Sequence, residues 1–150
     1  MLPTLQPDDH ILVRKAQVPE RWDIVMFYPP SDRFLHAERI VGLPGEVVEI
    51  DSSGVKINGK RVNPPSNVGP FPYLELPSGR TFSNGSAGHP IRLGGDEYFV
   101  LGDNCSGAGD SRVWTEPILN HQPGALPGEQ IIGVVTMLYW PPTRWKQFAN

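Results

Sequence analysis

Two short segments of this sequence combine charged side chains with glycine at spacings that could support chemistry. Residues 38–46 read ERIVGLPGE, and residues 98–114 read YFVLGDNCSGAGDSRVW. Each segment joins an apolar run, typical of a β-strand, to a turn that contains glycine, so charged groups would reach the rim of a sheet. Arginine and carboxylate groups at such a rim can fix a loop, and a buried carboxylate with a raised pKa can act as a general base.

The elements that would position these groups are strands, since no segment shows sustained helical periodicity. Apolar runs separated by turn residues predict strands at residues 11–15, 24–28, 35–43, 46–50, 55–57, 60–62, 97–101 and 131–140. Asn58-Gly59 predicts a tight hairpin, because both central positions of a type I′ turn need positive φ. Residues 63–93, rich in proline and glycine, predict an extended loop or a small β insertion. The fold class is therefore mainly β, with antiparallel strands.

Length and composition limit the classes of function. At 150 residues the chain fits one domain, residues 1–150, with its own core. A net charge of -3 without a Lys/Arg cluster argues against nucleic acid as a partner. Cys105 is the single cysteine, the four histidines are dispersed, and no phosphate-binding glycine loop is present, so we expect no internal disulfide, metal or cofactor. No apolar run approaches the roughly 18 residues of a membrane span.

Six motifs in order resemble the signal peptidase I family of membrane-anchored serine proteases: residues 1–5, 21–27, 38–46, 57–59, 102–114, and 131–133 with 140–141. The resemblance covers roughly the whole chain outside residues 63–93. It implies an antiparallel β-barrel or coiled β-sheet and a serine endopeptidase that cleaves signal peptides from secreted preproteins. It also implies a place on the extracytoplasmic side of a bacterial membrane. The given chain itself is expected to be soluble, with any anchor upstream of Met1 or in another protein.

The resemblance further implies a serine–lysine dyad, in which a lysine kept neutral by an apolar pocket takes the proton of a serine hydroxyl. In this chain the serine would precede Met1, the lysine position holds Glu38, and a supporting serine position holds Ala108. We therefore expect the chain to be catalytically inactive as given. His36 is offset by two residues from the base position, and we interpret it as a solvated edge histidine.

Glu38 has two interpretations. In the favoured one, the site has opened to solvent or gained a partner such as His36, which makes a carboxylate tolerable. In the other, Glu38 is buried with a raised pKa and is the base for a different nucleophile.

The remaining motif positions imply a preserved scaffold. In the family they form a charge-paired lock of the site, here Arg39, Asp110 and Arg112 with the loop Gly102-Asp103-Asn104. Met1, Leu2, Pro3 and His36 are candidates for lining a substrate groove. That groove would pair an extended peptide, such as the signal segment of a preprotein, as an added strand, which needs no dyad.

Aromatic residues give a candidate membrane contact, because Trp and Tyr suit the interface. They are Phe71, Tyr73, Trp140, Trp145 and Phe148, with core packing an alternative for Trp140 and Tyr73. Two other functions stay open. One is an active signal peptidase truncated just after its serine, with an unconventional base. The other is a relative of the self-cleaving repressor domains, which share serine–lysine chemistry, although Pro44-Gly45 and Asp110-Ser111-Arg112 favour signal peptidase.

Overall fold

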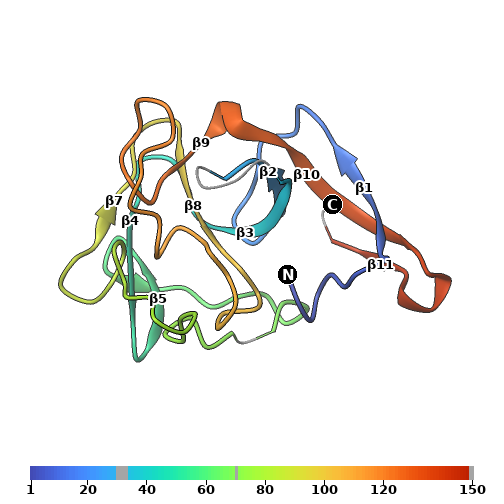
Figure 1. Ribbon diagram of the computed structural model, residues 1–150, viewed down its shortest axis with the longest axis horizontal. Coiled ribbons are helices and arrows are strands. Elements are labelled where there is room, and N and C mark those ends of the chain that lie inside the picture. The colour runs from blue at the N-terminus through green and yellow to red at the C-terminus, as the bar shows by residue number, and fades with distance from the viewer. Residues whose placement is uncertain (30–33, 70, 149–150) are drawn as a thin grey trace.

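The computed structural model describes residues 1–29, 34–69 and 71–148, and its strands form two antiparallel sheets (Figure 1). The larger sheet has the strand order β1-β10-β2-β3-β8-β9, and β11 also pairs with β10. Its strands are β1 (His10–Arg14), β2 (Ile24–Phe27), β3 (His36–Gly42), β8 (Glu97–Leu101), β9 (Leu126–Pro127), β10 (Ile131–Trp140) and β11 (Lys146–Gln147). The smaller sheet contains, in order, β6 (Lys60–Arg61), β5 (Gly54–Ile57), β4 (Val47–Asp51) and β7 (Ile91–Arg92).

The predicted mainly β fold with antiparallel strands is confirmed. Each strand expected from the sequence is present, and its ends differ from the predicted ones by no more than one residue. Three two-residue strands, β7, β9 and β11, were not predicted, and neither were the short 3-10 turns η1 (Gly128–Gln130) and η2 (Pro142–Arg144). Elements this short contain too few residues to produce a hydrophobic period, which explains why the sequence pattern missed them.

The hairpin between β5 and β6 has the predicted turn. Asn58 has φ 50° and Gly59 has φ 77°, so both central residues adopt the positive φ of a type I′ turn. The turn pairs Ile57 with Lys60 and Lys56 with Arg61. The Asn58 side chain also accepts a hydrogen bond from the backbone of Val47, which ties the turn to β4.

Residues 63–93 form a long, largely irregular segment that is nevertheless attached to the smaller sheet. Its last part contributes β7, which pairs with β4, and Ser86 bridges to Ile50 at the other end of β4. Tyr73 is only 5% exposed and packs in the core beside this sheet. The segment therefore combines a loop with a small β component, the two forms that its sequence predicted.

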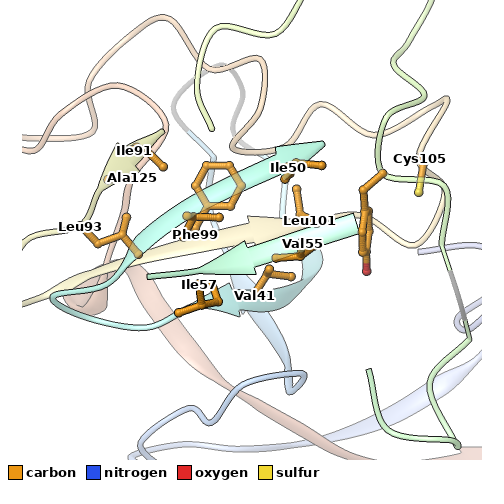
Figure 2. Packing of buried hydrophobic residues seen from close by; sticks show 12 residues of the cluster. Val41, Ile50, Val55, Ile57, Ile91, Leu93, Phe99, Leu101, Cys105 and Ala125 are labelled. Carbon is orange, nitrogen blue, oxygen red and sulfur yellow. The ribbon is translucent and has the colours of Figure 1, made fainter. Parts of the chain in front are cut away.

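Strands β3 and β8 are buried on both faces, and this is what lets them carry the site. Alternate residues point to opposite faces of a strand. One face supplies Val41, Phe99 and Leu101 to a core shared with the smaller sheet, and Figure 2 shows these side chains beside Ile50, Val55 and Ile57. The other face supplies Ile40, Tyr98 and Val100 to a second core with Val25, Phe27, Trp114 and Val134.

The aromatic candidates for membrane contact separate in the structure. Tyr73 is buried, as the core-packing alternative predicted, whereas Trp140 is 51% exposed and Trp145 is 58% exposed, so core packing was wrong for Trp140. Trp140 ends β10, and Trp145 directly precedes β11, so both lie on the same arm of the larger sheet (Figure 1). Within the described residues, no helix has the length and apolar character needed to cross a membrane.

Candidate functional site

The site is built where β3 passes beside β2, β8 and the loop after β8. Glu38 lies opposite Val25 of β2, and Arg39 lies opposite both Ile24 of β2 and Leu101 of β8. Because side chains alternate along a strand, Glu38 and Arg39 reach different neighbours although they are adjacent in sequence. The loop that follows β8 begins at Gly102 and provides the partners on both sides.

Glu38 is a buried carboxyl group, and no cation of residues 1–29, 34–69 or 71–148 forms an ion pair with it. Glu38 is only 6% exposed, and its Oε2 atom has no hydrogen-bond partner among the described residues. Burial raises its pKa to about 8, and the negative charges of Asp110 and Asp103 act in the same direction. The amino group of Met1 and the Arg112 guanidinium oppose this shift without cancelling it. Glu38 is therefore mostly protonated at pH 7.

Two small residues make this burial geometrically tight. A Cβ atom added at Gly102 would lie 2.7 Å from Glu38 Oε2 and 2.4 Å from the Cβ of Ala108. The loop backbone therefore approaches the carboxyl group more closely than any larger residue at position 102 would permit. Gly102 shapes the contact in addition to forming the turn that the sequence predicted.

The favoured interpretation of Glu38 from sequence was wrong. The carboxyl group is buried and not open to solvent, and its Oε2 has no hydrogen-bond partner among the described residues, so the less favoured interpretation, a buried glutamate with a raised pKa, describes what is found. His36 is the first residue of β3 and is partly buried, with its ring 6.3 Å from that of Phe27, so it lies at the strand end, as predicted, with part of its surface exposed. Sequence alone does not report the close approach of Gly102 to Glu38 Oε2.

Arg39, on the other face of β3, is fully paired. Its Nε and Nη2 atoms donate to the two carboxylate oxygens of Asp103 at 2.8 and 2.6 Å, and Nη1 donates to the carbonyl oxygen of Trp22 at 2.7 Å. The Thr4 hydroxyl donates to the same Asp103 carboxylate. This cluster fastens the N-terminal segment and the loop after β8 to β3.

Arg112 is buried completely and also has a full set of acceptors. It forms a two-point ion pair with Asp110, at 2.8 and 2.7 Å, and donates to the carbonyl oxygens of Tyr73, Glu75 and Cys105. Asp110 additionally accepts the backbone N–H of Gly102 at 2.9 Å. The pair therefore joins the loop after β8 to the irregular segment 63–93.

The sequence-derived lock thus consists of two separate ion pairs. Arg39 binds Asp103, and Arg112 binds Asp110. Five further contributors were missed: Thr4, Trp22, Tyr73, Glu75 and Cys105. Thr4 lies within residues 1–5, one of the six motifs, so its hydroxyl could have been nominated. The other four act through backbone carbonyl oxygens, and the side-chain sequence carries no signal for these.

A cavity of about 270 Å³ opens beside Glu38. It is lined by Met1, Leu35, His36, Ala37, Glu38, Asn104, Gly107, Ala108 and Gly109. Among the predicted groove residues, Met1 and His36 line this cavity, whereas Leu2 and Pro3 are exposed and do not. Glu38, Ala108 and the N-terminal segment therefore meet in one place, although they are distant in sequence.

The first residues of β3 pair with fewer strands than the rest of it. Residues 36–38 pair with β2, but pairing with β8 begins only at Arg39. The cavity thus lies between the start of β3 and the loop 104–109, an arrangement that can accept an extended chain.

Another cavity, of about 330 Å³, lies on the Arg39 side and includes Arg21, Trp22 and Lys146 in its lining. Its two arginines are already committed, because Arg21 pairs with Glu46 and Arg39 pairs with Asp103. It lacks the unpaired buried carboxyl group that distinguishes the Glu38 cavity.

The fold and site define a mainly β protein with a buried ionisable residue on a strand beside a cavity of about 270 Å³. The family model for signal peptidase, peptidase S26, matches residues 1–140, so the chain belongs to that family. The resemblance inferred from the six motifs is confirmed.

Similar proteins support the same family. The chain is 31% identical to a probable signal peptidase I-2 of Synechocystis and 31% identical to a signal peptidase I of Leptolyngbya laminosa, in each case over 96% of its length. It is 30% identical to a signal peptidase I of Bacillus caldolyticus, over 99% of its length and 78% of that protein. A crystal structure of a signal peptidase I from Enterococcus faecalis V583 matches 80% of this chain and 98% of that chain, with TM-score 0.55 and 26% identity.

The chain is shorter than several of these relatives. It spans 61% of the length of the Synechocystis protein and 66% of the Leptolyngbya protein. The match to the Enterococcus structure confirms that the antiparallel fold is of the signal peptidase I type.

Proposed function

We propose that this chain is a signal peptidase I-like protein that binds extended peptides, including signal segments of preproteins, and does not cleave them. The observation that carries this proposal is the buried, unpartnered carboxyl group of Glu38 at the position where the family resemblance implies a lysine base. A general base must accept a proton, and a carboxyl group with a pKa of about 8 already holds one at pH 7.

Ala108 supports the same conclusion from the other wall of the cavity. Ala108 lies against Gly102 and lines the same cavity as Glu38. Its methyl group can neither donate nor accept a hydrogen bond. The position that the resemblance assigns to a supporting serine therefore cannot orient a base. The two positions together favour binding without turnover.

Peptide binding itself is supported by the backbone. Ala37 lies on the edge of β3 that faces away from β2, where no described strand pairs with it, so its backbone can pair with an added strand; the loop 104–109 forms the opposite wall. The ion pairs of Arg39 and Arg112 hold this loop in place, so the groove is preorganised without any catalytic group. By the same family relationship, we place the protein at the extracytoplasmic side of a bacterial membrane, with Trp140 and Trp145 as candidate contacts to its surface.

The test is a binding measurement with a cleavage control. A signal-peptide segment with small residues at the cleavage site is titrated into the protein at pH 7, beside the same segment N-methylated at alternate residues. We expect the unmodified peptide to bind and the methylated one to bind at least tenfold more weakly, because it cannot form the strand hydrogen bonds. Mass spectrometry after incubation should find both peptides intact. Failure of the unmodified peptide to bind, or its cleavage at pH 7, would overturn the proposal.

A second candidate is an active peptidase in which Glu38 is the base, and the raised pKa of Glu38 is the observation that favours it. Such an enzyme would cleave preprotein increasingly as pH rises through about 8, and Glu38→Gln would abolish the cleavage. A protein carrying Glu38→Lys, Ala108→Ser and a serine before Met1 tests the family chemistry directly. Under the first proposal only this restored variant cleaves.

A further inference from the structure

We infer that the cavity beside Glu38 is a recognition subsite for a primary ammonium group, presented as a lysine side chain by a peptide bound along β3. The peptide part of this inference rests on the proposed function, whereas the ammonium subsite itself does not. No lysine of this chain lines the cavity.

The charge balance around Glu38 identifies the missing group as a cation. The two other buried acids nearby, Asp103 and Asp110, are each held at two points by an arginine. Glu38 is the remaining acid, and its Oε2 is buried without a hydrogen-bond partner among the described residues. An unsatisfied buried carboxyl oxygen is costly, so a donor that reaches it gains an unusually strong hydrogen bond.

The charged groups that face Glu38 are consistent with a positively charged ligand. Asp110 and Asp103 oppose its ionisation, while the amino group of Met1 and the guanidinium of Arg112 favour it. His36 lines the same cavity from the start of β3. Since Asp103 and Asp110 already pair with the two arginines, Glu38 has no cation in hydrogen-bond contact among the described residues, and an added ammonium would provide one for its ionised form.

The size and lining of the cavity favour a lysine side chain over a whole small molecule. Its volume of about 270 Å³ lies just below the roughly 300–1,000 Å³ of small-molecule sites. Met1, Leu35, Ala37 and Ala108 provide apolar surface for an alkyl stem, and Asn104 adds a polar residue to the lining. A compact ammonium suits the single buried oxygen, because the planar fork of arginine requires two acceptors side by side.

A small amine tests the subsite without any peptide. The probe is n-butylammonium, titrated into the whole protein while NMR follows the side-chain carboxyl carbon of Glu38 between pH 5 and 10. We expect its titration midpoint to fall by at least one pH unit, which corresponds to at least tenfold tighter amine binding to the ionised form. Tetramethylammonium has the same charge but no N–H donor, and it should leave the midpoint unchanged. An unchanged midpoint with n-butylammonium, or an equal shift with both ions, would overturn the inference.

A peptide pair tests how the ammonium is delivered. Two signal-peptide segments differ at one position, lysine against norleucine, which keeps the alkyl stem and removes the charge. We expect the lysine peptide to bind at least tenfold more tightly at pH 8, and Glu38→Gln to remove this preference, so that the two peptides bind that variant equally. Glu116→Gln, at an exposed glutamate, is the matched control and should keep the preference.

The two arms separate the possible failures. If neither peptide binds while n-butylammonium does, the proposed function and peptide delivery are wrong, and the ammonium subsite remains. If both peptides bind equally, the proposed function stands, and delivery by a lysine side chain is overturned.

Discussion

Glu38 and Arg39 are neighbours on one strand, and they show two ways in which a protein holds a buried charge. Arg39 is 3% exposed and binds two carboxylate oxygens and one carbonyl oxygen. Glu38 is 6% exposed and has an oxygen with no partner among the described residues. A buried ion is tolerated when its hydrogen-bonding capacity is met, whereas an unmet carboxyl group keeps its proton.

The difference between the two residues assigns them different tasks. The paired arginines maintain a rigid loop, because each bonds in a fixed geometry to the segments that it joins. The unpaired glutamate leaves free energy available to a ligand, because binding can supply the donor that the fold omits. Structure and recognition are thus divided between the two faces of β3, and each of the following changes tests one side of that division.

Arg112→Met should have the largest effect. It leaves Asp110 buried without its cation and removes the donors to three carbonyl oxygens, so we expect a loss of about 3–5 kcal/mol in the free energy of unfolding. Urea unfolding at pH 7 measures it. The double variant Arg112→Met, Asp110→Asn removes the stranded charge and keeps the acceptor for Gly102, so it should recover part of the loss. A double variant less stable than the single one would contradict this account.

Glu38→Gln should raise the free energy of unfolding above neutral pH, in contrast to Arg112→Met, which lowers it. The folded protein holds a proton on Glu38 that the unfolded chain releases above its ordinary pKa of 4.5. Stability from this group is therefore fully present below pH 4.5 and is lost as pH rises through about 8. We expect the variant to be more stable than the wild type by roughly 2–4 kcal/mol at pH 9 and nearly equal to it at pH 4. Urea unfolding across this pH range gives the comparison, and a difference independent of pH would refute it.

Gly102→Ala tests the close approach that seals Glu38. The new methyl group would meet both Glu38 Oε2 and Ala108, and we expect a loss of about 1–3 kcal/mol in the free energy of unfolding. Gly95→Ala is the matched control, because a Cβ atom there has no neighbour within 4 Å and it should change stability little. Adding Ala108→Gly should relieve part of the loss. Equal losses at positions 95 and 102 would show that packing against Glu38 is not the cause.

Local patterns in the sequence predicted most of the fold but not the state of Glu38. Alternation and turn chemistry placed β3 and β8, and Asn58-Gly59 fixed a hairpin, because these features depend on neighbours in the chain. The burial of Glu38 depends on Gly102 and Ala108, which are more than sixty positions away. The same distance explains the backbone acceptors of Arg112 in residues 63–93, where proline and glycine leave no periodic pattern.

Glu97 is a second buried glutamate, and its pKa shifts in the direction opposite to that of Glu38. Both are 6% exposed, and burial alone would raise the pKa of each. For Glu97, hydrogen bonds from the backbone of Gly94, the side chain of Gln122 and His121 outweigh burial and lower the pKa. For Glu97, hydrogen-bond partners therefore outweigh burial, whereas Oε2 of Glu38 has no such partner among the described residues.

Glu97→Gln should accordingly change the free energy of unfolding with a pH dependence opposite to that expected for Glu38→Gln. Because the pKa of Glu97 is lowered in the folded state, its stabilisation is present above the unfolded pKa and is lost as pH falls through the folded one. We expect Glu97→Gln to cost about 1 kcal/mol at pH 7 and less at pH 3. Urea unfolding at both pH values measures the change, beside Glu116→Gln as an exposed control. If Glu97→Gln instead lowers the free energy of unfolding more at pH 3 than at pH 7, the hydrogen bonds to Gly94 and Gln122 do not depend on the charge of Glu97. The contrast with Glu38 would then rest on burial alone.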